Sequence, residues 1–232
     1  MRLNYLHSPL GPKDFGTAAR IQHDLRDRIL SRPPRPHLPI SLVAGCDVAA
    51  SARSDVAHAA VVVLTFPGLE PFEEATASGR VAMPYVPGFL AFREAPVLAA
   101  ALERLRCEPD LFLFDGQGVA HPRGMGLASY MGLMVDRPSI GVAKSRLYGS
   151  FSPPGVNRGD SSPLLDDGGR EIGRVLRSRH GVRPLFISVG HLLSLDDAVR
   201  FTLVCGKGLR LPEPTRLADI LVGRLGRTWT IR

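Results

Sequence analysis

Four consecutive apolar residues, Leu111 to Phe114, stand directly before Asp115 and constrain the fold more than any other stretch of the chain. A strand with one face in water alternates apolar and polar residues, whereas a strand covered on both faces is apolar throughout. The run therefore predicts a central strand of a parallel sheet with a layer on each side. A carboxylate at its end then lies at the carboxyl edge of the sheet, where open α/β sheets bind ligands.

Helical and apolar segments alternate around this run. Apolar residues spaced three and four apart predict a helix over residues 92–106, and a second helix is expected over residues 126–135. Residues 140–143 are expected to form another buried strand. Strand, helix and strand in this order are typical of a βαβ unit, so the chain is predicted to be an α/β protein.

The remaining elements are expected to belong to the same single domain. The valine-rich segments 42–49 and 59–66 predict neighbouring strands joined in a hairpin. Further elements are expected at residues 17–30 (an amphipathic helix), 74–83, 174–178 and 185–189 (strands), and 195–205 (a helix with Ser194 as its N-cap). The predicted parts of the domain are a helix and linker at 1–40, a core at 41–149, a mobile loop rich in Pro, Gly, Ser and Asp at 150–170, and the rest of the domain at 171–232.

Charge is the unusual part of the composition. The 232 residues include 29 Lys and Arg against 22 Asp and Glu, a net charge of +7. This balance suits a polyanionic partner such as nucleic acid, although many soluble proteins are basic without such a role. The three cysteines, Cys46, Cys107 and Cys205, are too far apart in sequence to indicate a disulfide framework or a zinc ribbon. With no apolar signal-peptide core and no run long enough for a bilayer, a cytoplasmic protein without membrane contact is expected.

Three acidic side chains are expected to converge. Asp47 interrupts the apolar segment 42–49, Asp115 ends the buried strand, and Glu94 lies on the predicted buried side of the intervening helix. Buried like charges repel and lose hydration, so such a cluster is tolerable only with a cation or with shared protons. Oxygen-only ligation favours Mg²⁺ or Mn²⁺. The alternative for each carboxylate taken alone is a structural role, as a helix cap or an acceptor for backbone amides.

His121, Lys144 and Tyr85 are further candidates. His121 and Lys144 are expected at the edge where the buried strand ends, where a histidine can move a proton and a lysine can stabilise charge on phosphate. A turn residue and a solvated strand end are their alternative roles. Tyr85 stands between Pro84 and Pro87, which stiffen the backbone, so its ring suits a wedge inserted into a base stack. An aromatic lid over the core is the alternative for Tyr85.

Four ordered blocks of sequence together resemble one family. They are MPYVPGFLAFRE at 83–94, FDGQGVAHPR at 114–123, PSIGVAKSRL at 138–147 and LPEPTRLAD at 211–219. The blocks resemble endonuclease V, a nuclease that acts on deoxyinosine in DNA, and the resemblance covers nearly the whole chain. It implies an RNase H-like fold, a mixed β-sheet flanked by α-helices. It also implies hydrolysis of the second phosphodiester bond on the 3′ side of the lesion, leaving a 3′-hydroxyl.

The resemblance further implies roles for particular residues. Asp47, Glu94 and Asp115 would surround a divalent metal, Mg²⁺ with Mn²⁺ as a substitute, while His121 and Lys144 match active-site positions. The wedge and the pocket for the flipped base are implied at Tyr85, Pro84, Pro87, Gly88, Leu90, Gly116 and Gly126. A monomer is expected because no dimerisation heptad is present.

Three other positions and the substrate stay open. Tyr130 stands where the family resemblance leads us to expect histidine, and Asp219 stands where relatives carry either histidine or aspartate, so neither receives a role. Arg216 is expected to contact phosphate or to form a structural ion pair. DNA containing deoxyinosine and RNA containing inosine are both candidate substrates. A noncatalytic nucleic-acid binding protein is disfavoured, because a pure binder gains nothing from burying negative charge near phosphate.

Overall fold

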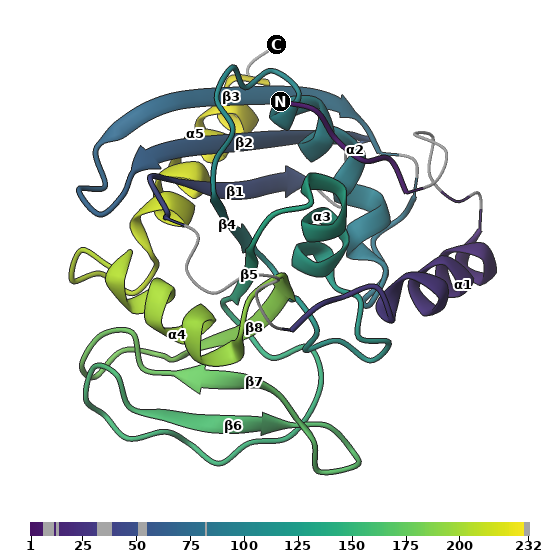
Figure 1. Ribbon diagram of the computed structural model, residues 1–232. Coiled ribbons are helices and arrows are strands. Elements are labelled where there is room, and N and C mark those ends of the chain that lie inside the picture. Colours follow the sequence, from purple (N-terminus) through teal and green to yellow (C-terminus); the bar gives the residue numbers. More distant parts are fainter. Residues whose placement is uncertain (7–11, 13, 32–38, 51–54, 82, 230–232) are drawn as a thin grey trace.

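The computed structural model describes residues 1–6, 12, 14–31, 39–50, 55–81 and 83–229. The strands are β1 (Leu42–Ala50), β2 (Val56–Thr65), β3 (Pro71–Arg80), β4 (Leu111–Asp115), β5 (Ser139–Ala143), β6 (Ser161–Leu165), β7 (Glu171–Leu176) and β8 (Leu185–His191). The helices are α1 (Phe15–Arg26), α2 (Leu90–Leu102), α3 (Leu127–Val135), α4 (Leu195–Val204) and α5 (Glu213–Trp229). Over these residues the strands form one mixed sheet in the order β3-β2-β1-β4-β5-β8-β7-β6 (Figure 1).

The apolar run before Asp115 is strand β4, and it lies in the middle of the sheet as predicted. It pairs in parallel with β1 on one side and with β5 on the other. The predicted hairpin of β1 and β2 is also present, with antiparallel pairing that sets Asp47 opposite Ala60. Because β1, β4 and β5 run in the same direction, their carboxyl ends meet at one edge of the sheet.

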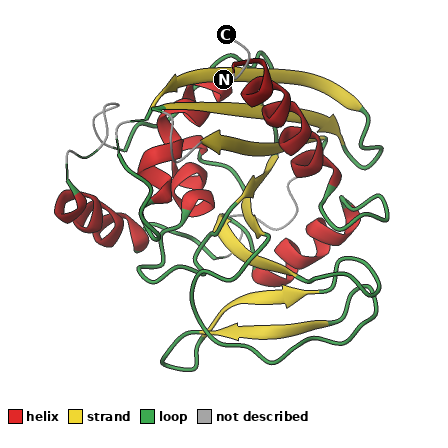
Figure 2. Cartoon of the chain, turned by 180° about the vertical axis from the view of Figure 1, so that it is seen from behind, coloured by secondary structure: helices red, strands yellow, loops and turns green. Residues whose placement is uncertain are grey.

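Helices cover both faces of the sheet, which explains why β4 carries no polar residue before its end. Phe112 and Phe114 point to the layer that contains α2 and α3, while Leu111 and Leu113 point to the layer that contains α4 and α5. Figures 1 and 2 show the two helical layers from opposite sides. Full burial of each of these side chains contributes about 1.5–3 kcal/mol of favourable transfer free energy. The predicted α/β, RNase H-like architecture is confirmed.

Helix α5 reaches the sheet through a close contact at Gly45 of β1. A Cβ atom at Gly45 would lie 2.0 Å from the carbonyl carbon of Pro214 and 2.4 Å from the backbone nitrogen of Thr215. Glycine has no Cβ, so the helix backbone can approach the strand backbone here. This contact places Asp219, one turn further along α5, beside the carboxyl edge of β1.

Two elements are missing from the sequence predictions, and the bounds of several others differ from the predicted ones. Helix α5 was not predicted, and β6 lies inside the segment 150–170, so the prediction of a loop is wrong for residues 161–165. Strand β6 is at the edge of the sheet, where Pro163 can be accommodated without a missing ladder bond inside the sheet. Helix α1 ends at Arg26, before the predicted end at residue 30, and the predicted N-cap of α4 is confirmed because Ser194 accepts from the amide of Asp197. The proline-rich linker at 32–38 lies outside the described residues.

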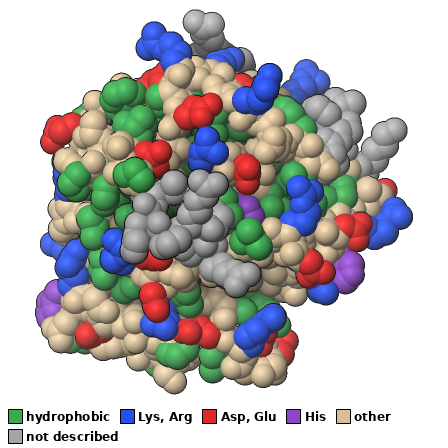
Figure 3. Space-filling model, in the orientation of Figure 1, with side chains coloured by type: hydrophobic (Ala, Val, Ile, Leu, Met, Phe, Trp, Pro, Cys, Tyr) green, Lys and Arg blue, Asp and Glu red, His purple; other side chains and the backbone are tan. Residues whose placement is uncertain are grey.

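Surface charge is mixed on the face drawn in Figure 3. Lys and Arg side chains lie among Asp and Glu side chains there and do not gather into one patch. Cys46, Cys107 and Cys205 are free. Among the described residues, none of the helices has the length and apolar character needed to cross a membrane.

Candidate active site

Three aspartates from three elements meet at the carboxyl edge of the sheet. Each of Asp47, Asp115 and Asp219 offers one carboxylate oxygen, and these oxygens all lie within 4.8 Å of one another. The parallel register explains the first pair, because Cys46 faces Phe114 and the next residue of each strand is an aspartate. Helix α5 brings the third. The group lines a cleft of about 480 Å³, so it is open to a ligand.

Lys144, one residue beyond β5, stands between two of these carboxylates. Its Nζ lies 2.5 Å from Oδ2 of Asp115 and 2.7 Å from Oδ1 of Asp219. Burial lowers the pKa of Lys144, but the charge and hydrogen bond of Asp115, with help from Asp219, outweigh burial and leave the pKa above its usual value. Lys144 therefore stays charged and offsets part of the negative charge of the cluster.

One lysine does not neutralise the cluster. Burial, followed by the charge of Asp115, raises the pKa of Asp47 to about 8. Burial also raises the pKa of Asp115, against the opposing charge of Lys144. Glu94 on α2 is buried as well, and burial followed by the charges of Asp47 and Asp115 raises its pKa to about 8. Glu94 does not belong to the group of oxygens within 4.8 Å of one another, although the charges of the two aspartates raise its pKa.

The donor set fits a hard divalent cation. Asp47, Asp115 and Asp219 offer only carboxylate oxygens, which are the ligands that Mg²⁺ and Mn²⁺ prefer. The raised carboxyl pKa values point the same way, because negative charge gathered in a partly buried site needs a cation or protons to offset it. The residues present could therefore hold a metal ion at this edge of the sheet.

Both ring nitrogens of His121 make hydrogen bonds to backbone groups. The backbone N–H of Arg123 donates to Nδ1 of His121 at 3.1 Å, so Nδ1 carries no proton. Nε2 then carries the proton and donates to the carbonyl oxygen of Gly88 at 2.9 Å. Burial, followed by the charge of Arg123, lowers the pKa of His121 to about 4, so the ring is neutral near pH 7. Both ring nitrogens thus form hydrogen bonds to backbone groups, and His121 connects the loop that contains Gly88 with the loop that contains Arg123.

These two loops carry the residues expected to form the wedge and the base pocket. In the first, Tyr85 is 60% exposed between Pro84 and Pro87, and it leads to buried Gly88 and to Leu90 at the start of α2. The second runs from Gly116 to Gly126. A Cβ at Gly126 would lie 2.3 Å from the carbonyl oxygen of Gln117, so this loop is folded tightly on itself.

Three positions left open by the sequence now have contacts. Asp219 belongs to the acidic group, and no local pattern could reveal this because α5 reaches the site through tertiary packing. Arg216 makes a bidentate ion pair with Glu213, with both hydrogen bonds at 2.7 Å. Of the two roles expected for Arg216, this contact is the structural ion pair. Tyr130 is buried on α3 with its ring 5.4 Å from that of Phe92.

Fold and site together define a class of protein. An acidic group able to hold a metal, at the carboxyl edge of an RNase H-like sheet, is suited to displacement at phosphorus in nucleic acid. The family model for Endonuclease V matches residues 23–220 of the chain. The chain belongs to the Endonuclease V family, and it is therefore a nuclease.

Individual relatives agree with this assignment over most of their length. Endonuclease V of Roseiflexus sp. (strain RS-1) is 48% identical over 218 residues, which are 93% of this chain and 96% of the relative. The crystal structure of Endonuclease V from Streptomyces avermitilis has a TM-score of 0.88 and 46% identity, covering 94% of this chain and 96% of that one. Endonuclease V of Ciona intestinalis, at 27% identity and a TM-score of 0.81 over 92% of this chain and 98% of that one, was crystallised with a 24mer DNA containing an inosine followed by a ribo-adenosine.

Proposed function

We propose that the protein is a metal-dependent DNA repair endonuclease that recognises deoxyinosine and hydrolyses the second phosphodiester bond on its 3′ side. The observation that carries the proposal is the group of Asp47, Asp115 and Asp219 with Lys144, open to a cleft in a chain of the Endonuclease V family. The choice of lesion and of bond rests on the family resemblance. A monomer acting in the cytoplasm belongs to the same proposal, and the three free cysteines suit a reducing compartment.

The acidic residues would hold the cation. Asp47, Asp115 and Asp219 are the proposed ligands, with Glu94 beside them, for Mg²⁺ or for Mn²⁺ as a substitute. When bound, such an ion lowers the pKa of water and stabilises negative charge at the phosphate. Without a cation these carboxylates would repel the DNA backbone, so the same residues make catalysis depend on metal.

The remaining site residues position the substrate. Lys144 holds its charged Nζ between two carboxylates at the edge of the cleft, where it can stabilise charge on the scissile phosphate. The exposed ring of Tyr85 would fill the space left by the flipped base. Backbone groups of Gly88, Leu90, Gly116 and Gly126 would line the pocket for that base. His121 would support this pocket through its hydrogen bond to Gly88.

The test is a strand-mapping nicking assay on a duplex with one deoxyinosine, run with Mg²⁺ and again with EDTA. We expect a single Mg²⁺-dependent cut at the second phosphodiester 3′ to the lesion. Asp47→Ala should abolish nicking and keep its fold and DNA binding, whereas Asp24→Ala, at an exposed position on α1, should nick like the wild type. Cutting that persists in EDTA or in Asp47→Ala would contradict the mechanism.

RNA containing inosine is the second candidate substrate. The Ciona relative was crystallised with DNA in which a ribonucleotide follows the inosine, which favours testing ribose at that position. RNA and DNA strands with one inosine each should therefore be compared side by side. Cutting of RNA alone would replace the deoxyribonuclease proposal, and tight binding without metal-dependent turnover would favour a noncatalytic binding protein.

A further inference from the structure

Helix α1 buries a polar side chain in the middle of its inner face. The helix lies at the side of the molecule (Figure 1), and Gln22 is 0% exposed between buried Ala18 and Leu25. An unpaired amide in such a place costs free energy, so a buried glutamine needs a partner for each of its polar atoms. Gln22 has all of these partners, and their identity suggests what the residue does.

Three hydrogen bonds join Gln22 to two loops. Its Nε2 donates to the carbonyl oxygen of Gly88 at 3.0 Å and to that of Met125 at 2.9 Å. Its Oε1 accepts from Nε of Arg123 at 2.5 Å. Both amide hydrogens face carbonyls and the amide oxygen faces a guanidinium, so the network fixes the orientation of the side chain.

The two loops are the walls of the proposed base pocket. Gly88 closes the segment that presents Tyr85, and Met125 directly precedes Gly126. The carbonyl oxygen of Gly88 also accepts from Nη2 of Arg123 at 2.6 Å and from His121, so several donors converge on it. Gly88 has φ +83°, and a Cβ there would lie 2.9 Å from Nη2 of Arg123, so this geometry favours glycine.

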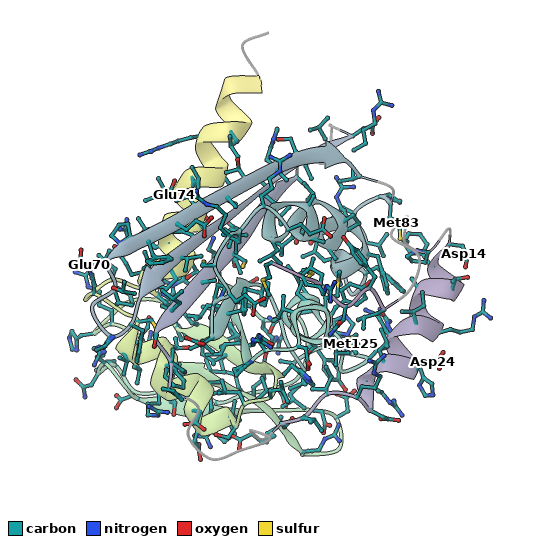
Figure 4. The ribbon with its side chains drawn as sticks, turned by 45° about the horizontal axis from the view of Figure 1, so that its top comes forward. Asp14, Asp24, Glu70, Glu74, Met83 and Met125 are labelled. Carbon is teal, nitrogen blue, oxygen red and sulfur yellow. The ribbon has the colours of Figure 1, made fainter. Side chains whose placement is uncertain are left out.

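An aromatic contact ties α1 to the first loop a second time. The guanidinium of Arg123 lies 4.2 Å from the centre of the Phe89 ring, and the Phe89 ring lies 5.1 Å from the ring of Phe15 on α1. Figure 4 shows α1 against the side of the molecule where Met83 and Met125 lie. The helix thus holds both loops, mainly through Gln22.

We propose that Gln22 is a positioning residue for base recognition, which sets the separation of the two pocket walls by holding Gly88 and Met125. The inference rests on the proposed function and deepens it, because it assigns lesion selectivity in part to a residue outside the pocket. The hydrogen bonds of Gln22 go to the pocket loops, whereas the acidic group is built by β1, β4 and α5. Loss of Gln22 should therefore change recognition of the lesion and leave metal binding intact.

Two substitutions separate the roles of the amide. Gln22→Met keeps the length of the side chain and removes all three hydrogen bonds. Gln22→Glu keeps an acceptor for Arg123 and removes both donors to the carbonyls. Leu25→Ala is the matched control, since it loosens the same buried face of α1 and leaves the network in place.

The experiment compares single-turnover nicking of a deoxyinosine duplex and of an undamaged duplex, together with the melting temperature and calorimetric Mn²⁺ binding. We expect both Gln22 variants to lose about tenfold or more of the preference for deoxyinosine, through a higher half-saturating DNA concentration, because small displacements of positioning groups have effects of this size or larger. Mn²⁺ affinity should not change. Leu25→Ala should lower the melting temperature and keep the preference.

If Gln22→Met prefers the deoxyinosine duplex as strongly as Leu25→Ala does, the inference is overturned and Gln22 is a structural residue. Should both Gln22 variants fail to fold, Phe15→Ala tests the second tie at a ring that is already 37% exposed, and an unchanged preference there would overturn the inference. A wild-type protein without any preference for deoxyinosine would overturn the proposed function itself, and the role of Gln22 with it.

Discussion

Gly45→Ala tests whether the contact between β1 and α5 builds the acidic group. The added Cβ would lie 2.0 Å and 2.1 Å from the carbonyl carbon and oxygen of Pro214, where ordinary contacts begin at 3.4 Å. These are backbone atoms of a helix, so no single side chain can turn away. The first turn of α5 would have to move out by about 1.4 Å, and Asp219 would move with it.

The expected cost follows from this displacement. Overpacking inside a well-packed structure costs about 1–3 kcal/mol. Because the clash here is with backbone atoms, which cannot turn away, we expect a loss of about 3 kcal/mol in the free energy of unfolding. We also expect weaker Mn²⁺ binding, because Asp47 on β1 and Asp219 on α5 must lie close together to share an ion.

Urea unfolding and calorimetric Mn²⁺ titration are the measurements. Gly79→Ala on β3 is the matched control, since the nearest atom to its added Cβ is Cγ2 of Val97 at 4.0 Å. The control should change the free energy of unfolding by no more than about 0.5 kcal/mol. A Gly45→Ala protein as stable as this control, with wild-type Mn²⁺ affinity, would refute the argument.

Two further predictions concern pH and the proposed wedge. Hydrogen bonds from the backbone of Arg106 and from Cys107 lower the pKa of Glu73 from 4.5 to about 2, so the Glu73 carboxylate stabilises the fold above pH 4.5 and loses this contribution as the pH falls toward 2. In urea unfolding, the free energy of unfolding of the wild type should therefore exceed that of Glu73→Gln by about 1–2 kcal/mol at pH 6 and by less at pH 3. A difference that does not change with pH would contradict the assignment. Tyr85→Ala should lower the rate of deoxyinosine nicking about tenfold and leave the stability of the fold unchanged. Phe72→Ala removes an equally exposed ring on β3 and should leave the nicking rate unchanged. Equal nicking rates in the two variants would rule out the wedge.

The central layers of the fold could be predicted because local pattern and tertiary role coincide there. The run Leu111 to Phe114 is apolar throughout since its two faces meet two helical layers, and the same reasoning identified β5. The valine-rich hairpin and the N-cap at Ser194 likewise depend on neighbours in sequence. Such elements are visible in a single sequence.

Elements defined by their partners were not predicted. The prolines of the segment LPEPTRLAD suggest a break, yet Pro214 lies in the first turn of α5, where the missing amide proton costs nothing. The composition around Ser161–Leu165 is that of a loop, and pairing with β7 makes it a strand. In both cases the deciding contact is absent from the local sequence.

The site divides in the same way. Asp47 lies within a predicted strand, and Asp115 and Lys144 lie at the ends of two others, so their meeting at one edge could be inferred from topology, and the structure brings them together. Asp219 could not be placed because its helix was not predicted. The hydrogen bond between the His121 ring and the carbonyl oxygen of Gly88 could not be predicted either, because Gly88 lies 33 positions earlier in the chain.

The distance in sequence between Asp47 and Asp219 has a consequence for the order of folding. Strand β1 and helix α5 lie far apart in the chain, and loop closure over so many residues costs entropy before any contact compensates for it. During synthesis from the N-terminus, the sheet edge with Asp47 and Asp115 emerges from the ribosome well before α5 does. The complete acidic group therefore cannot form before α5 has been synthesised, because a shorter nascent chain lacks Asp219.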